Sequence, residues 1–114
     1  MKVVIQRVSS ASVTVGDVVV SSIERGFLVL VGLHVDDTPE KFDFFIKKIL
    51  NLRVFEDDEG KMNTSILDNE REILFVSQFT LYADCRKGNR PSFVKAMPPD
   101  KARGMYQQFV DRFR

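Results

Sequence analysis

A tight-turn signal near the amino terminus is the feature that most constrains the fold. Gly16-Asp17 stands between VTV and VVV, two runs of β-branched residues, and such a pair between such runs predicts a two-residue β-hairpin. Arg25-Gly26 then separates the second run from the apolar stretch FLVLVGL at residues 27–33. We therefore expect three or four antiparallel strands at the start of the fold.

The period of the apolar residues changes after residue 37. Thr38 can cap a helix, and Pro39 suits a first helical turn. Apolar side chains then recur at spacings of three and four, which predicts a helix over about 38–52 with one face buried on the sheet. They are Phe42, Phe45, Ile46, Ile49 and Leu50.

A second helix is predicted over about 99–114, after Pro98-Pro99. Its apolar side chains are Ala102, Met105, Tyr106, Phe109, Val110 and Phe113. Because this pattern is still running at Arg114, without a terminating glycine or asparagine, we expect the natural chain to be longer. No linker or internal repeat divides residues 1–114, so we expect one domain that is truncated at its carboxyl end.

The segment between the helices contains strand and turn signals. LRVF at residues 52–55 is typical of a short strand and EDDEGK at 56–61 of an acidic turn. DNER at 68–71 predicts another turn, which leads into a long strand over 72–82. These elements together predict an α+β fold with an antiparallel or mixed sheet and two flanking helices.

The long strand changes character at its end, in SQFTLYA. Successive side chains of a strand point to opposite faces, so Gln78 and Thr80 are expected to share one face. The other face carries Ser77, Phe79 and Leu81. One face of the strand would therefore end in two neutral groups that can form hydrogen bonds.

Metal and nucleotide cofactors are not indicated. His34 is the only histidine and Cys85 the only cysteine, which is too few for a zinc site. The acidic run 56–59 lacks the alternating spacing and closing glutamate of a calcium loop. Neither G-x-x-x-x-G-K nor G-x-G-x-x-G is present, so we expect neither a metal nor a cofactor.

Two kinds of nucleophilic pair are open on the residues alone. A hydroxyl needs a base that takes its proton, and Ser77 or Thr80 could use His34 in this way. Cys85 could also pair with His34, because two neighbouring cations would favour its thiolate. Spacing does not choose between these pairs, and residues of these types are more often structural than catalytic.

The carboxyl-terminal quarter of the chain is basic. Residues 85–114 hold 8 Lys and Arg against 2 Asp and Glu, whereas residues 1–84 hold 9 against 14. In CRKGNRPSF, the cations Arg86, Lys87 and Arg90 surround a Gly-Asn turn that an aromatic residue follows. Such residues can bind phosphate oxygens and stack on unpaired bases. A phosphorylated or single-stranded partner fits this loop, and a solvated basic surface is the alternative.

The sequence also predicts a cellular compartment. Gln6 and Arg7 interrupt the amino-terminal apolar run too early for a signal peptide, and no stretch is long and apolar enough to span a membrane. A single cysteine excludes an internal disulfide. These features predict a soluble protein of the reducing cytoplasm.

Four segments together resemble one family. SQFTLYAD followed by KGNRPSF, with NLRVFEDDEGKMN before it and MKVVIQRVSSASVTV at the start, is similar to the D-aminoacyl-tRNA deacylases, the D-tyrosyl-tRNA deacylase family. The resemblance implies a barrel-like β fold flanked by helices, and a homodimer with a cross-subunit active site. It implies hydrolysis of the ester that joins a D-amino acid to tRNA, or glycine mischarged on tRNA-Ala, as chiral proofreading in translation.

The resemblance also implies roles for particular residues. The aminoacyl-adenosine pocket would be lined by Ser77, Gln78, Phe79, Thr80 and Leu81. Catalysis would rest on Gln78, Phe79 and Thr80, with Thr80 as a nucleophile in one proposal and the tRNA 2′-hydroxyl assisting in another. For tRNA binding we expect Arg86, Lys87, Asn89 and Arg90.

Oxyanion stabilisation suits the sequence better than a covalent mechanism. A nucleophilic Thr80 needs a neighbouring base, and the sequence offers only His34 or a distant carboxylate. Main-chain N–H groups near Phe79 and Thr80, aimed at developing negative charge, could each contribute roughly 3 kcal/mol. We therefore expect Thr80→Ala to retain most activity.

The sequence departs from the family in one motif. The family's Gly-Pro pair near the carboxyl end enters the partner's pocket and is described as excluding L-amino acids, but here no proline follows a glycine. We expect the strand that carries this pair to be missing, and chiral selection by the 114-residue form to be impaired. The alternative function is a non-catalytic, dimeric RNA- or nucleic-acid-binding module that uses the basic loop 86–95.

Overall fold

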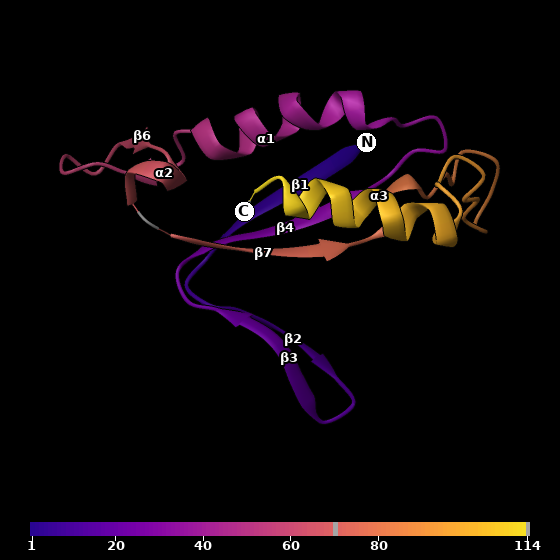
Figure 1. Ribbon diagram of the computed structural model, residues 1–114, viewed down its shortest axis with the longest axis horizontal. Helices are drawn as coiled ribbons and strands as arrows, with labels where there is room; N and C mark the ends of the chain where they lie inside the picture. The colour runs from indigo at the N-terminus through magenta and orange to yellow at the C-terminus, as the bar shows by residue number, and fades with distance from the viewer. Residues whose placement is uncertain (70, 114) are drawn as a thin grey trace.

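A three-stranded mixed sheet forms the centre of the protein. The computed structural model describes residues 1–69 and 71–113, and the strand order is β1 (Lys2–Val8), β4 (Gly26–Gly32), β7 (Glu72–Ser77). β1 is antiparallel to β4, whereas β7 is parallel to it. A parallel pair needs a long connection, and the segment between β4 and β7 supplies it (Figure 1).

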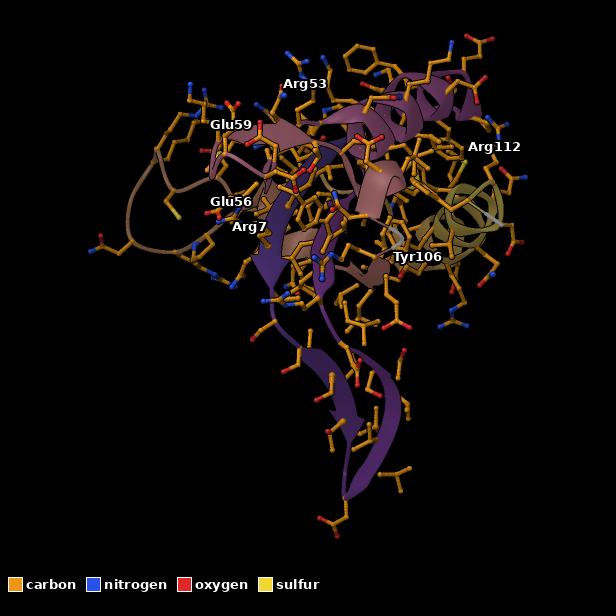
Figure 2. All side chains as sticks on the ribbon, turned by 90° about the vertical axis from the view of Figure 1, so that its left-hand side faces the viewer. Arg7, Arg53, Glu56, Glu59, Tyr106 and Arg112 are labelled. Atoms are coloured by element: carbon orange, nitrogen blue, oxygen red, sulfur yellow. The ribbon has the colours of Figure 1, made fainter. Side chains whose placement is uncertain are left out.

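The predicted hairpin is confirmed. β2 (Ala11–Val15) and β3 (Val18–Ile23) pair with each other, and the turn between them places Gly16 at a φ of +60°. β4 pairs with β1 instead of β3, so the hairpin is a separate two-stranded sheet. Figures 1 and 2 both show it extending away from the rest of the molecule.

Both predicted helices are present, and both cover the same face of the sheet (Figure 1). A 3-10 turn at Pro39–Lys41 leads into α1 (Phe42–Asn51), and α3 spans Pro99–Asp111. Thr38 lies at the N-cap position, but its side chain makes no capping hydrogen bond. The predicted end of the second helix, Arg114, lies outside the described residues.

The core forms between this face of the sheet and the two helices. Alternate residues of β4, Phe27 and Val29, are fully buried together with Phe42 of α1 and Phe109 of α3. The rings of Phe42 and Phe109 meet edge to face, with centroids 5.3 Å apart. Arg112, between the helices in Figure 2, adds an ion pair to Asp43 at 3.2 Å.

The segment between the helices is more irregular than expected. A short two-stranded ribbon, β5 (Phe55–Glu56) and β6 (Met62–Thr64), flanks the acidic turn, and a single helical turn, α2 (Ile66–Asn69), follows it. The predicted turn at 68–71 therefore overlaps the end of α2, and its third residue lies outside the described part of the chain.

The predicted α+β fold with a mixed sheet and flanking helices is confirmed. Among the described residues the sheets do not close into a full barrel. One detail of the prediction is corrected by the structure. The strand expected over 72–82 ends at Ser77, and a 3-10 turn, η2 (Phe79–Tyr82), follows it. The reason is a change of partner, because beyond β4 the main chain of Leu33 accepts a hydrogen bond from Met97 at 2.9 Å. The segment around Met97 lies beside Leu33, in the position that β7 would have to occupy to pair further.

The second face of the sheet carries apolar side chains, and no helix of residues 1–69 or 71–113 covers it. Val4 of β1 is 46% exposed, and Leu30 and Val76 are half-buried. The hairpin adds four further exposed valines at 15, 18, 19 and 20. Within the described residues, no helix is long and apolar enough to cross a membrane.

Candidate functional site

The segment SQFTL lies where β7 gives way to the turn η2. The Gln78 N–H donates to the Val31 carbonyl at 2.8 Å, which is the last hydrogen bond to β4. The turn then closes through Leu81 N–H to the Gln78 carbonyl at 3.3 Å and Ala83 N–H to the Thr80 carbonyl at 3.0 Å. The main chain of the motif therefore lies at the end of the sheet, where the strand β7 changes into the turn η2.

The start of this turn leaves two main-chain donors free. The first N–H groups of a helical turn have no partner within it. The N–H groups of Phe79 and Thr80 donate to no oxygen in residues 1–69 or 71–113. Two neighbouring free amides of this kind can bind an oxyanion.

The side chains of Gln78 and Thr80 are in contact, but in the turn η2 and at its N-cap, and not on one face of a strand as predicted. The Gln78 Nε2 donates a hydrogen bond to the Thr80 Oγ1. A side-chain amide does not accept a proton as a base does, in either orientation. The nearest polar partner of the Thr80 hydroxyl therefore cannot activate it as a nucleophile.

His34 is engaged elsewhere. Its Nδ1 accepts a hydrogen bond from the Asp36 N–H at 3.0 Å, and its ring packs edge to face on Tyr82, with centroids 5.4 Å apart. No hydrogen bond joins its side chain to Thr80 or Cys85 among the described residues. The geometry favours neither nucleophilic pair.

An open cavity of about 510 Å³ lies beside the motif. Ser77 and Phe79 form one wall, and the segment from Phe93 to Pro99 together with α3 forms the others. The rings of Phe79 and Phe93 meet edge to face at 5.1 Å. Arg103 is the one charged residue in the lining, so the cavity suits a largely neutral ligand with an apolar part.

Three of the five motif residues lie outside this lining. Gln78 and Thr80 do not line the cavity, and Leu81 packs on β4, where a Cβ added at Gly32 would lie 3.0 Å from the Leu81 Cβ. Seven further residues of the lining were not predicted from the sequence. They are Ala96, Met97, Pro98, Pro99, Ala102, Arg103 and Tyr106.

The residues that α3 contributes to the cavity wall were noticed in the sequence, but they were interpreted as core residues. Ala102 and Tyr106 belong to the apolar stripe of the helix, and both are half-buried. Burial raises the pKa of the Tyr106 hydroxyl, which stays protonated near neutral pH and can donate a hydrogen bond. Figure 2 shows Tyr106 on α3, on the side that faces the sheet.

The basic loop after the motif is exposed, and hydrogen bonds between its two ends close it at its base. Asp84 and Ser92 exchange two main-chain hydrogen bonds of 2.8 Å at its base. The Arg86 guanidinium binds both carboxylate oxygens of Asp84, at 3.0 to 3.2 Å through Nε and 2.7 Å through Nη2, and holds the pKa of that carboxyl well below its usual range. Lys87, Asn89 and Arg90 are exposed. Asp84 therefore neutralises the charge of Arg86, whereas Lys87 and Arg90 form no ion pair among the described residues.

A smaller cavity, of about 330 Å³, lies at the other end of η2, beside Tyr82. Lys2, Tyr82 and Lys95 contribute to its walls. Burial, and then the charge of Asp37, raises the pKa of Tyr82 to about 12, so its ring is neutral at physiological pH. Among the described residues, no group of His, Cys, Asp and Glu could hold a metal ion.

Comparisons with known proteins agree on one family. Residues 4–114 match the family model described as D-Tyr-tRNA(Tyr) deacylase. A D-aminoacyl-tRNA deacylase of Thermotoga petrophila is 52% identical over 114 residues, which are 100% of this chain and 76% of the relative. One of Clostridium kluyveri is 50% identical over 112 residues, or 98% of this chain and 75% of the relative.

Solved structures extend this similarity to the fold. A structure described as c-Myc DNA Unwinding Element Binding Protein superposes with a TM-score of 0.94 at 50% identity, over 100% of this chain and 76% of that one. A probable eukaryotic D-amino acid tRNA deacylase, at 22% identity and a TM-score of 0.79 over 94% of this chain and 63% of its own, shares the fold. By its sequence and its structure, the chain belongs to the D-Tyr-tRNA(Tyr) deacylase family.

Proposed function

We propose that this protein hydrolyses the ester of D-aminoacyl-tRNA and releases the free D-amino acid and tRNA. Its family and its relatives at about half identity support the reaction class. One structural observation carries the assignment to a site, namely the free N–H group of Phe79, which lines the cavity beside Ser77, and the free N–H group of its neighbour Thr80. The aminoacyl group and terminal adenosine would occupy this cavity.

The reaction needs little from protein side chains. Water adds to the ester carbonyl carbon, and the carbonyl oxygen gains negative charge that the two amides can stabilise. The bond to the ribose 3′-oxygen then breaks, and that oxygen receives the proton lost by the water. The neighbouring ribose 2′-hydroxyl can relay this proton, so Thr80 serves to position the motif through Gln78 and is not the nucleophile.

The proposal has finer parts that rest on the family resemblance and on the chemistry of the surface. The substrates are D-aminoacyl-tRNAs, with glycine on mischarged tRNA-Ala as a further one, and the exposed loop cations Lys87 and Arg90 contact the tRNA. The protein works in the cytoplasm as a homodimer whose partner completes the cavity. Residues 1–114 make up one domain, which spans about three quarters of the length of the relatives.

The test is a deacylation assay with two matched substrates. The purified chain is mixed with D-tyrosyl-tRNA and with L-tyrosyl-tRNA, and the release of each amino acid is followed against the spontaneous rate. Release of D-tyrosine above that rate supports the proposal, and Phe79→Pro, which removes one donor together with the ring in the cavity wall, should lower it on the order of a hundredfold or more. Binding of tRNA without release of either amino acid would instead indicate the alternative, a nucleic-acid-binding module.

A further inference from the structure

We propose that the cavity at the Tyr82 end of η2 binds the phosphate that precedes the terminal adenosine of the tRNA. The inference rests on the proposed function and assigns two residues to it, Lys2 and Lys95, which lie outside the motif in the sequence. The ligand is a phosphodiester of single-stranded RNA. The charge of the cavity, the position of Lys2 and the length of η2 support this assignment.

The cavity has an excess of positive charge. Lys2, Lys95 and Arg86 contribute cations to its walls, and Asp84 is its one carboxylate. Arg86 holds that carboxylate at 2.7 Å, so its charge is already balanced. Lys2 and Lys95 form no ion pair with any carboxylate in the described part of the chain. Two ammonium groups therefore remain for an anion.

Lys2 is held in position before any ligand arrives. Its Nζ donates to the Leu81 carbonyl at 3.2 Å and lies 4.8 Å from the centre of the Tyr82 ring. Because the contact to Leu81 uses one of the three protons of the ammonium group, the others can donate to a phosphate oxygen. A held side chain also loses less conformational entropy on binding.

The length of η2, whose two ends line the two cavities, suits one nucleotide. Phe79 lines the larger cavity and Tyr82 the smaller one, and both belong to the same turn. Three residues of a 3-10 helix rise about 6 Å, which is close to the length of one nucleotide unit. An adenosine whose 3′-ester lies at Phe79 can therefore place its 5′-phosphate near Tyr82 and Lys2.

A binding experiment tests the inference with stable analogues. D-tyrosine is joined by an amide to 3′-amino-3′-deoxyadenosine, once with and once without a 5′-phosphate, and the affinity of each for the chain is measured by titration calorimetry. We expect the phosphate to tighten binding roughly tenfold, and the gain to fall as salt rises. Lys2→Met and Lys95→Met should each lose most of the gain, whereas Lys47→Met on α1 should keep it.

Each other outcome has a distinct meaning. Equal affinity for both analogues in the unchanged protein would overturn the inference and leave the proposed function intact. If neither analogue binds, the proposed function fails and the inference with it. If inorganic phosphate alone protects Lys2 and Lys95 from acetylation as well as the phosphorylated analogue does, the site is not specific for an RNA end and the inference is overturned.

Discussion

The Thr80 hydroxyl accepts a hydrogen bond from the Gln78 amide, and that partner limits what the hydroxyl can do. A nucleophile needs a base, and none of its contacts supplies one. We expect Thr80→Ala to keep kcat for D-tyrosyl-tRNA within about fivefold, since it loses one neutral hydrogen bond. A loss on the order of 10⁶-fold, the scale seen when a catalytic nucleophile is removed, would contradict this. Single-turnover deacylation measures the effect.

The carboxylate of Asp37 is the centre of a buried cluster. Its side chain is 1% exposed and binds the terminal ammonium of Met1 at 2.7 Å, the His34 N–H at 2.6 Å and Lys41 at 3.1 Å. Burial alone would raise the pKa of this carboxyl, but the hydrogen bonds to the terminal ammonium, to His34 and to Lys41 outweigh burial and lower it. The cluster thus ties the start of β1 to the segment before α1.

Asp37→Asn should lower the free energy of unfolding by about 3 kcal/mol near neutral pH, because the buried ammonium loses its counter-ion. The folded pKa of Asp37 lies below its unfolded value, so its contribution is present above about pH 4 and is lost as the pH falls further. Urea unfolding at a series of pH values should show this acid-side loss in the unchanged protein and less of it in the variant. Asp36→Asn, at an exposed neighbour, is the control.

At the scale of elements, the period of the apolar residues predicted which elements form, but it did not predict where each strand ends. The hairpin around Gly16 and the two amphipathic helices could be read from local spacing, because those signals lie within each element. The end of β7 could not, since it depends on Met97 pairing with Leu33, two segments more than 60 residues apart. No local pattern distinguishes a continuing strand from one that loses its neighbour.

The candidate site follows the same division. The sequence identified SQFTL because its polar residues interrupt an apolar strand, and Ser77 and Phe79 do line the cavity. It did not identify the wall from α3, because Ala102 and Tyr106 have the spacing of core residues. It also did not identify Lys2, whose contact with Leu81 crosses 79 positions of sequence.

Two glycines test the packing between elements. A Cβ at Gly26 of β4 would lie 1.8 Å from the Glu72 carbonyl oxygen, whereas a Cβ at Gly104 of α3 would meet nothing within 4 Å. We expect Gly26→Ala to destabilise by at least about 2 kcal/mol, because the backbones of β4 and β7 must separate. Gly104→Ala should stabilise by about 0.5–1 kcal/mol through helix propensity. Thermal unfolding of both variants checks the contrast, and a stable Gly26→Ala would show that the two strands can separate at little cost.

At the scale of the whole molecule, the hairpin tip carries a group of four exposed valines. Val15 and Val18 are 65% and 64% exposed, and Val19 and Val20 are both 58% exposed. Exposed apolar surface of this kind favours contact with another protein surface. The proposed homodimer would give it a partner.

We expect the protein to associate with itself as its concentration rises, and Val18→Thr with Val20→Thr to weaken that association at least several-fold. Threonine keeps the β-branched shape, so the hairpin should still form. Sedimentation velocity over a concentration series measures the association, and Ser21→Thr on the same strand is the control. Equal association of the double variant and the control would assign the contact to another surface.

The position of β4 in the sheet has a consequence for the protein's synthesis. β4 is the middle strand, but β7, its partner on one side, begins at residue 72. On the ribosome, the chain must emerge as far as Ser77 before this partner is complete. Until then the earlier strands have an open edge that can pair with a neighbouring nascent chain. Slow codons placed soon after β4 would prolong that interval, and we expect them to lower the yield of folded protein more than slow codons after β7.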